Sequence, residues 1–274
     1  MAKNLFDLKD NVSIVTGGGQ GIGKTLAIGL AMQGSDVIIA DISFGNALAT
    51  SKEIENLGRK SKAIKCDVSS SKDVKNMVKS VLDEFNHVDI LINCAGISKK
   101  SFVIDMEDKD WNEVISINLR GVFLCCREVV KLMIKQKKGR IINITSVMGK
   151  VGRLGSAHYS ASKAGINALT KALALEVAKY GITVNAIAPC SIDSPLLKPL
   201  IEKKLINIDE IIQRNPIGRL GKLEELVGPA IFLASEASSL VTGHILNVDG
   251  GFSSGYRVSY KSGEMRIDPD KIKI

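Results

Sequence analysis

The sequence predicts an α/β fold, in which a seven-stranded parallel sheet is doubly wound and carries helices on both faces. Short runs of β-branched and apolar residues alternate with helical stretches along the chain. These runs are apolar along their whole length, as is typical of parallel strands buried on both faces. We find no linker or low-complexity stretch in the 274 residues and therefore expect a single domain spanning 1–274.

The individual elements follow from local composition and periodicity. The β-branched content predicts strands at 12–16, 36–40, 62–66, 89–93, 140–145, 182–188 and 244–248. Apolar residues at helical spacing predict helices at 22–33, 46–58, 71–85, about 108–138 and about 157–180. Glycines close the first two helices and a serine caps the third. Because such crossovers are right-handed, consecutive helices pack back onto the sheet.

Two segments depart from this alternation. Residues 190–220 contain three prolines and two short amphipathic pieces, which predicts a lid or insertion without a strand. Residues 252–274 form a polar tail beyond the last strand. The tail either reaches a neighbouring subunit or packs as a surface strap, and the sequence leaves both open.

Composition and charge exclude several classes of protein. The chain is 45% hydrophobic, has no long apolar run and lacks an apolar region near its N-terminus, so we expect a cytoplasmic protein without a membrane segment. The net charge is +8, but the lysines are dispersed among acids and only 4% of residues are aromatic, so we do not expect nucleic-acid binding. The five cysteines have no Cys-x-x-Cys spacing and the three histidines are far apart, so we expect reduced thiols and no metal site.

A glycine-rich turn follows the first strand and opens the first helix. In "TGGGQGIG", residues 16–23, Gly17, Gly21 and Gly23 lack a Cβ, so the backbone can closely approach a pyrophosphate at the helix N-terminus. This context indicates a Rossmann-type dinucleotide site. The overlapping "GGQGIGKT" also satisfies the Walker A pattern, so both interpretations are open at this point.

An acidic residue ends the second strand. Asp41 lies about twenty residues beyond the glycines, where a carboxylate holds the adenosine ribose hydroxyls of NAD. Ile42 and Ser43 follow, with no arginine to neutralise a 2′-phosphate, so the sequence favours NAD over NADP. An N-cap role for Asp41 is the alternative.

A second constellation lies in the middle of the chain. Tyr159 and Lys163 are four residues apart, so they share one face of a helix. Ser146 ends the fifth strand, where a parallel sheet presents its ligands. Asn118 lies in the middle of a long helix, an unfavourable position for asparagine.

Taken together, these motifs resemble the short-chain dehydrogenase/reductase family. The resemblance rests on "TGGGQGIG", "CDV" at 66–68, "NCAG" at 93–96, Asn118, Ser146, the Tyr159–Lys163 pair and "VDGG" at 248–251, and it extends from about Leu8 to Phe252. It replaces the Walker A interpretation, because that family uses the same glycine turn for NAD(P). It also implies a homotetramer.

The resemblance implies a role for each motif residue. Tyr159 is the general acid or base, Lys163 assists its ionisation and binds the nicotinamide ribose, and Ser146 hydrogen-bonds the substrate carbonyl or hydroxyl. Asn118 holds a water that relays protons to Lys163. Asp67 contacts the adenine, and Asn93 the adenosine ribose. The implied cofactor contacts are Gly17, Gln20, Gly21, Ile22, Gly23, Asp41, Asp67, Val68, Asn93, Ala95, Gly96, Tyr159, Lys163, Pro189, Ile192 and Ser194.

The chain departs from the family pattern at two positions. Cys94 replaces the second asparagine of the usual "NNAG", where we expect little effect. Cys190 replaces the glycine of the usual Pro-Gly after the sixth strand, and its Cβ can crowd the nicotinamide or substrate side. Ser194 keeps the hydroxyl of the usual threonine.

The substrate is the least determined part of the prediction. Lys99, Lys100 and Arg153 fall near the expected pocket mouth, and similar positions in gluconate 5-dehydrogenase-like members of the family are often basic. We therefore expect an NAD(H)-dependent enzyme that interconverts a secondary alcohol and a ketone of a sugar acid or polyol, with Ser146 and Tyr159 also contacting this small-molecule substrate. The alternatives are a 3-oxoacyl-carrier-protein reductase, a hydroxysteroid dehydrogenase and a non-catalytic NAD-binding scaffold. Asp41 argues against the first, because that reaction commonly uses NADPH.

Overall fold

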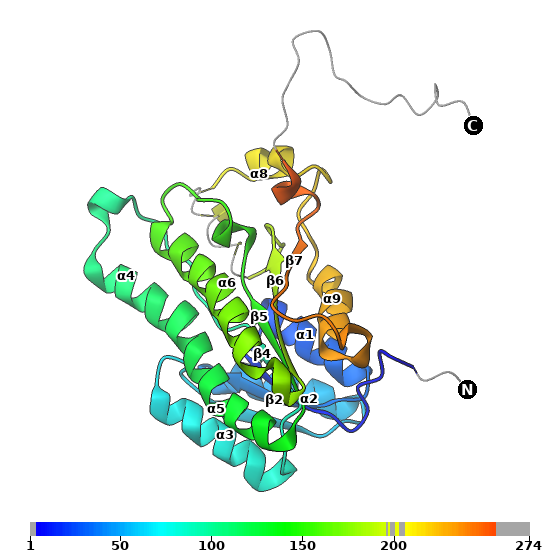
Figure 1. The fold of residues 1–274 in the computed structure, drawn as a ribbon. Helices are drawn as coiled ribbons and strands as arrows, with labels where there is room; N and C mark the ends of the chain where they lie inside the picture. The colour runs from blue at the N-terminus through cyan, green and yellow to red at the C-terminus, as the bar shows by residue number, and fades with distance from the viewer. Residues whose placement is uncertain (1–3, 196, 198–200, 203–205, 256–274) are drawn as a thin grey trace, which may run out of the picture.

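A computed structural model describes residues 4–195, 197, 201–202 and 206–255. Its described part contains the predicted seven-stranded parallel sheet, with strand order β3-β2-β1-β4-β5-β6-β7 (Figure 1). The chain crosses back over β1 to reach β4, so this is a doubly wound sheet. The strands are β1 Val12–Thr16, β2 Asp36–Asp41, β3 Ser61–Lys65, β4 Ile90–Asn93, β5 Gly139–Ile144, β6 Ile182–Pro189 and β7 Ile245–Val248.

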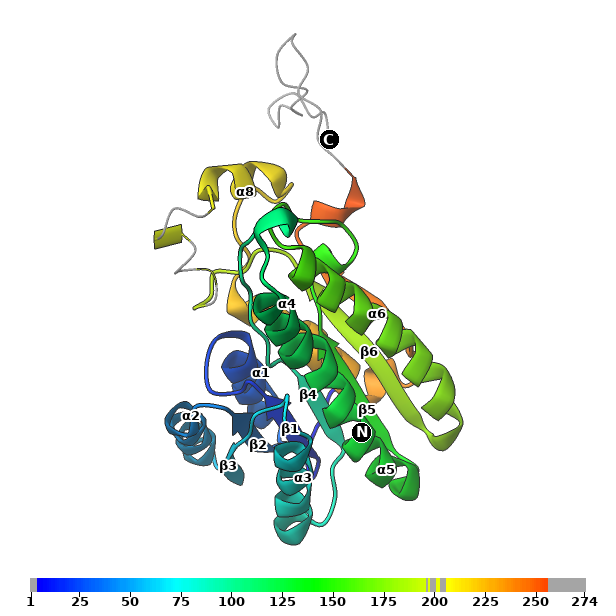
Figure 2. The same cartoon turned by 90° about the vertical axis from the view of Figure 1, so that its left-hand side faces the viewer.

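Helices cover both faces of the sheet (Figure 2). Helices α3, α5 and α6 pack on one face, and α1, α2 and α9 pack on the other. The helices are α1 Gly21–Met32, α2 Phe44–Asn56, α3 Ser71–Phe85, α4 Asp108–Ile115, α5 Gly121–Gln136, α6 Ala157–Val177, α8 Ile208–Arg214 and α9 Val227–Ala234.

Each central strand supplies apolar residues to both layers of the core. In β2, for example, Ile38 faces α3 and α5 while Ile39 faces α1 and α2, and both are fully buried. The expectation that all strands are apolar throughout is wrong for β3 and β7. These two strands lie at the edges of the sheet, so their side chains stay partly exposed and tolerate lysine or asparagine.

Two helical predictions need correction. The long helix expected at 108–138 is α4 and α5 joined by a π-helical turn over Ser116–Arg120, and it ends at Gln136 because Lys137 is left-handed, with φ 55°. The sequence pattern predicts no element between 221 and 243, where α9 lies. The α9 sequence "VGPAIFLA" is short, contains glycine and proline and is apolar all round, so its pattern does not indicate an amphipathic helix.

The expected lid between 190 and 220 is partly described. Its two ends lie side by side, because Asp193 N–H donates to Gly221 O at 2.9 Å and Gly221 N–H donates to Ser191 O at 3.0 Å. Helix α8 lies beyond the carboxyl ends of β6 and β7 (Figure 1). Residues 196, 198–200 and 203–205 lie outside the described part. The same holds for most of the predicted tail, of which only 252–255 is described.

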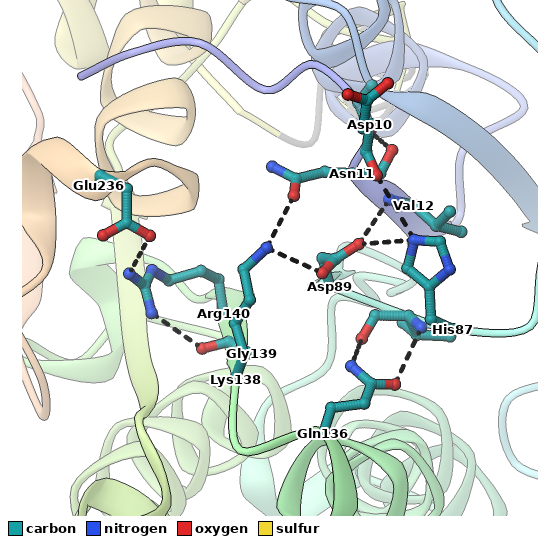
Figure 3. Close-up of polar contacts among 12 residues, drawn as sticks. Asp10, Asn11, Val12, His87, Asp89, Gln136, Lys138, Gly139, Arg140 and Glu236 are labelled. Atoms are coloured by element: carbon teal, nitrogen blue, oxygen red, sulfur yellow. Dashed lines mark hydrogen bonds and ion pairs between the residues drawn. The ribbon is translucent and has the colours of Figure 1, made fainter. Parts of the chain in front are cut away.

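Figure 3 shows a polar cluster at the opposite, amino end of the sheet. Buried Asp89 accepts hydrogen bonds from Val12 N–H at 2.9 Å and from Lys138 Nζ at 3.1 Å, and His87 Nε2 lies 3.2 Å from it. Arg140 pairs with Glu236 at 3.1 Å. These contacts fix the starts of β1, β4 and β5. No helix in the described residues is both long enough and apolar enough to cross a membrane.

Candidate active site

The predicted site residues meet at the carboxyl edge of the sheet. Parallel strands bring their carboxyl ends to one edge, on either side of the point where the strand order reverses. The carboxyl ends of β1, β2, β4, β5 and β6 and the segments after them therefore lie there together, at 17–23, 41–43, 94–97, 145–149 and 190–194.

The glycine turn is closely packed, and side chains at its glycines would not fit. Gly17 and Gly21 adopt left-handed φ values of 66° and 53°. A Cβ on Gly17 would lie 2.7 Å from Ala95 Cα, and one on Gly23 would lie 2.1 Å from Gly17 O. The side chain of the N-cap residue Gln20 makes no capping hydrogen bond to α1, so it does not occupy the first N–H groups of the helix. This cradle fits the pyrophosphate of a dinucleotide.

Asp41 is held against this turn. Its carboxylate accepts hydrogen bonds from Gly19 N–H and from Ser43 N–H, both at 2.9 Å. The N-cap residue of α2 is Ser43, so the alternative capping role for Asp41 is wrong. Lys24 pairs with Glu53 at 2.7 Å, which directs its ammonium to α2 instead of to a phosphate. This is a further argument against a Walker A loop.

Two residues expected around the adenosine have different environments. Asp67 is half-buried and accepts two hydrogen bonds from Ser69, at 2.9 Å from the N–H and 2.7 Å from the hydroxyl. The Asn93 side chain is only 2% exposed and donates to Asn143 Oδ1 at 2.8 Å, inside the core. The amide of Asn93 is thus engaged within the core, on the side of α5, and the expected contact of Asn93 with the adenosine ribose stays a prediction.

Asn118 lies in the π-helical turn and is fully buried. Its Oδ1 accepts from Ile97 N–H at 2.8 Å, and its Nδ2 donates to Ile97 O at 2.9 Å and to Ser162 Oγ at 3.2 Å. The Asn118 side chain thus makes the two hydrogen bonds to the Ile97 backbone that a neighbouring strand would make in a sheet. Ser162 in turn donates to Tyr159 O at 2.7 Å, so Asn118 is connected to the start of α6.

The remaining three residues of the predicted constellation converge from β5 and α6. Buried Lys163 donates from Nζ to Ile144 O at 2.9 Å, and this Nζ lies 5.7 Å from the centre of the Tyr159 ring. Ser146 is 8% exposed, and its Oγ accepts from Met148 N–H at 3.1 Å. The Tyr159 side chain is half-buried at the same edge.

Two of the three basic residues named for the substrate, Arg153 and Lys100, lie close to each other, and Arg153 lies against the Tyr159 ring. The Arg153 guanidinium carbon is 5.0 Å from the centre of the Tyr159 ring, and its nitrogens donate to Ser98 at 2.9 Å and Ser156 at 3.1 Å. Lys100 donates to the carbonyl of residue 154 at 3.1 Å. Burial lowers the pKa of Arg153, and burial together with the Arg153 charge lowers the pKa of Lys100. No carboxylate in the described part of the chain pairs with either.

Lys99 has a different role. It pairs with Asp110 at 2.7 Å and with Glu113, both on α4, and these contacts raise the pKa of Lys99. The structure therefore assigns its charge to holding α4 against the loop after β4.

Sequence reasoning missed His158, which directly precedes Tyr159. The imidazole is fully buried, burial lowers its pKa, and neither ring nitrogen has a hydrogen-bond partner in the described residues. Because a lone histidine next to a tyrosine carries no spacing signal, only the fold reveals its burial.

Cys190 borders a cavity of about 460 Å³ between the ends of β6 and β7 and the returning end of the 190–220 segment. Its Sγ accepts from Asn215 Nδ2 at 3.7 Å, and burial raises the pKa of its thiol. The side chain that replaces the family's glycine is therefore accommodated through a contact with Asn215.

Comparisons with known proteins agree with this geometry. Residues 17–253 match a family model described as enoyl-(acyl carrier protein) reductase. The 3-oxoacyl-[acyl-carrier-protein] reductase of Synechocystis sp. is 42% identical over 246 residues, covering 89% of this chain and 97% of that protein. The corresponding Thermotoga maritima protein is 40% identical over 244 residues, covering 89% and 98%.

A solved structure of a gluconate 5-dehydrogenase from Burkholderia cenocepacia, in complex with NADP and tartrate, superposes with a TM-score of 0.88. It is 35% identical, and the match covers 92% of this chain and 98% of that chain. The family match spans most of the sequence, and the relatives exceed 30% identity over nearly their full length. The chain therefore belongs to the short-chain dehydrogenase/reductase family and is an oxidoreductase acting on CH–OH and C=O groups.

Proposed function

We propose that this enzyme interconverts a secondary alcohol and a ketone of a sugar acid or a related polyol, with NAD(H) as the hydride carrier. The observation that carries the proposal is Arg153, which lies against the Tyr159 ring with Lys100 close to it, and neither cation has an acidic partner in the described residues. A partly buried guanidinium is costly to desolvate unless an anion pairs with it. A substrate carboxylate would supply this anion, in the bidentate geometry that arginine favours.

The position of these cations argues for a small substrate. Arg153 lies 5.0 Å from the ring that carries the proposed acid/base group, so a carboxylate bound there belongs to the same small molecule as the reacting carbon. In a carrier-bound acyl group, a long pantetheine arm places the acidic carrier protein far from the reacting carbonyl. The neighbourhood of Tyr159 would then contain an uncharged thioester, which gives Arg153 and Lys100 no partner.

The residues of this chain fit the roles that the proposed reaction requires. A bound nicotinamide would accept or supply the hydride. In the oxidation direction, the Tyr159 phenolic oxygen takes the hydroxyl proton of the substrate, and Ser146 Oγ orients the reacting oxygen. Lys163, fixed by Ile144 O and 5.7 Å from the Tyr159 ring centre, would bind the nicotinamide ribose. The glycine turn and Asp41 would hold the adenosine half, with Ile192 and Ser194 near the nicotinamide.

The preference for NAD rests on Asp41. Its carboxylate is fixed by two backbone hydrogen bonds at the end of β2, where it can accept hydrogen bonds from ribose hydroxyls. A 2′-phosphate at this position would meet a like charge. The gluconate 5-dehydrogenase of B. cenocepacia was solved with NADP, so the preference has to be measured for this chain.

The second candidate is a 3-oxoacyl-carrier-protein reductase. It is favoured by the 42% identity to the Synechocystis enzyme over 97% of that protein's length. The two candidates differ in cofactor and in substrate charge near the reacting carbon, so one set of assays separates them.

The decisive experiment measures kcat/KM for gluconate, sorbitol, a hydroxysteroid and an acetoacetyl thioester, each with NAD(H) and NADP(H). We expect the highest value for the sugar acid with NAD. A highest value for the thioester with NADPH would refute the proposal and establish the second candidate. Loss of gluconate activity in Arg153→Gln with the sorbitol rate retained would support carboxylate pairing.

We also propose a homotetramer and a cytoplasmic location. Large apolar side chains are exposed on the face formed by α4, α5 and α6, including Trp111, Phe123 and Leu175. All five cysteines are free thiols, which suits a reducing compartment. Light scattering coupled to size-exclusion chromatography tests the tetramer, and a monomeric mass at micromolar concentration would refute it.

A further inference from the structure

Lys163 is held at both of its ends by Ile144, the last residue of β5, and by the residue after it. The Lys163 Nζ donates to Ile144 O at 2.9 Å. The next residue, Thr145, donates from its hydroxyl to the backbone carbonyl of Lys163 at 3.0 Å. Thr145 is only 3% exposed, so this hydrogen bond is shielded from water. Two consecutive residues therefore fix the ammonium and the main chain of Lys163 against the same strand end.

The backbone at Thr145 is itself fixed by the sheet. Its N–H donates to Ile187 O at 2.9 Å, so the pairing with β6 continues beyond the last residue of β5. Four residues later the chain packs directly on α6, because a Cβ on Gly149 would lie 2.7 Å from the carbonyl carbon and 2.8 Å from the carbonyl oxygen of Lys163. The 145–149 segment and the Lys163 turn of α6 are thus in close contact through their backbones, and a shift of either one is transmitted to the other.

The Thr145 hydroxyl is not needed to satisfy the hydrogen bonds of the helix. Lys163 lies inside α6, where a carbonyl has the N–H four residues further along as its regular partner. The bond from Thr145 is an additional one to the same oxygen, which a carbonyl with two lone pairs can accept. The effect of this hydroxyl is therefore one of position, because it sets where the helix lies relative to the strand end at the level of Lys163.

The two elements that Thr145 joins carry the proposed reacting groups. Ser146 directly follows Thr145, and Tyr159 lies one turn before Lys163 on α6. We propose that Thr145 is a positioning residue of the active site, whose hydroxyl holds the Lys163 turn of α6 in register with Ser146. The inference rests on the proposed function, because Thr145 acts through the residues to which that function assigns roles. It does not depend on which alcohol or ketone is the substrate.

The test compares two substitutions of Thr145. Thr145→Val keeps the shape of the side chain and removes the hydroxyl, whereas Thr145→Ser keeps the hydroxyl and removes the methyl group. Activity is measured both as gluconate oxidation with NAD and as reduction of an acetoacetyl thioester with NADPH. With whichever substrate wild type turns over, we expect kcat of Thr145→Val to fall by about 10–100-fold, because small displacements of reacting groups are costly. Thr145→Ser should stay within about threefold of wild type, because its hydroxyl can make the same hydrogen bond.

Cofactor affinity provides a measurement that needs no substrate. The proposed function has Lys163 bind the nicotinamide ribose, so a displaced Lys163 would lose part of this contact. In a fluorescence titration with NADH, we expect Kd of Thr145→Val to rise by about 2–10-fold, which is the effect of weakening one hydrogen bond. Thr145→Ser should bind NADH as wild type does.

Thr170→Val is the matched control for a loss of stability alone. Thr170 lies on α6 seven residues beyond Lys163 and is fully buried, and its hydroxyl donates to Ile166 O at 2.8 Å and accepts from Asn143 Nδ2 at 2.9 Å. Its removal leaves a buried amide donor without this partner, so Tm should fall at least as far as in Thr145→Val. The kcat and the NADH Kd of Thr170→Val should stay within about twofold of wild type, because the hydrogen bonds of Lys163 are retained.

The outcomes separate this inference from the proposed function. If Thr145→Val keeps the wild-type kcat and NADH Kd, or if Thr145→Ser or Thr170→Val loses as much activity as Thr145→Val, the inference is wrong. If the thioester is the better substrate and Thr145→Val shows the expected loss with it, the proposed function fails and the inference stands. If wild type turns over neither substrate, the NADH titration decides, and an unchanged Kd in Thr145→Val overturns the inference.

Discussion

Substitution of Asn118 by alanine should destabilise the enzyme as well as inactivate it. The Asn118 amide is fully buried and holds both Ile97 N–H, at 2.8 Å, and Ile97 O, at 2.9 Å. Alanine leaves these two backbone groups without partners inside the protein. Each such group costs about 1–3 kcal/mol, so the free energy of unfolding should fall by about 2–6 kcal/mol. Ser162 keeps its bond to Tyr159 O and adds little to this loss.

The loss is large enough to measure by thermal unfolding. For a chain of this size, 1 kcal/mol corresponds to about 2–4 °C in Tm, so we expect a decrease of roughly 4–24 °C. Asn112→Ala is the matched control, because Asn112 lies on α4 and is exposed. Its effect should remain within about 0.5 kcal/mol.

Activity and stability together test whether Asn118 positions the loop or acts directly. We expect kcat of Asn118→Ala to fall at least tenfold, because the loop after β4 and the start of α6 both lose their connection through this side chain. Asn118→Asp keeps an acceptor for Ile97 N–H but cannot donate to Ile97 O, so it should not restore stability. A wild-type Tm for Asn118→Ala would refute the reasoning, even if activity were lost.

Three further predictions address the chemistry of the site. Tyr159→Phe should lower kcat by about 10²–10⁴-fold with little change in NAD affinity, as measured by steady-state kinetics and fluorescence titration; full turnover would contradict the acid/base role. Asp41→Ala should reduce the ratio of kcat/KM for NAD to that for NADP by at least tenfold, and a wild-type enzyme that already prefers NADPH would disprove the basis of this prediction. Burial raises the pKa of Cys94 to about 12 and that of Cys190 above its ordinary value, so both thiols should stay protonated at pH 8. In labelling followed by mass spectrometry, both should therefore react with iodoacetamide far more slowly than in the urea-unfolded chain. Rapid labelling of Cys190 in the native enzyme would show that its environment differs from the one described.

The strands and the motif positions could be predicted because their signals are local. A buried β-branched run such as "VSIVT" has one favourable environment, and a glycine turn between a strand and a helix is recognisable by itself. Asn118 was identifiable as unusual because asparagine is disfavoured inside a helix, but the π-helical turn and the contacts to Ile97 depend on tertiary packing. The α9 sequence has no amphipathic pattern, so it does not predict a helix. The orientation of the Asn93 amide toward the core depends on its hydrogen bond to Asn143, a residue that only the fold brings close.

The basic residues show most clearly where sequence reasoning stops. Lys99, Lys100 and Arg153 were equivalent as charges near a pocket mouth, and nothing in their sequence neighbourhood ranks them. The fold separates them, because α4 brings two acids to Lys99 and none to Arg153. A charge paired at close range within the protein contributes little to ligand binding, whereas an unpaired one retains its full capacity to attract an anion.

The two ends of the sheet also differ in whether their charged side chains are paired within the protein. At the amino end, Asp89 is surrounded by donors and Arg140 pairs with Glu236, so the charges there are largely satisfied within the fold (Figure 3). At the carboxyl end, Arg153 and Lys100 have hydroxyl and carbonyl partners but no counter-charge in the described chain. Cations that are partly buried without a counter-charge lower the stability of a protein. Such an arrangement is typical of sites where a bound ligand supplies the counter-charge. The carboxyl end is therefore the place where an anionic substrate would replace the missing partner, directly beside Tyr159, the proposed acid/base residue.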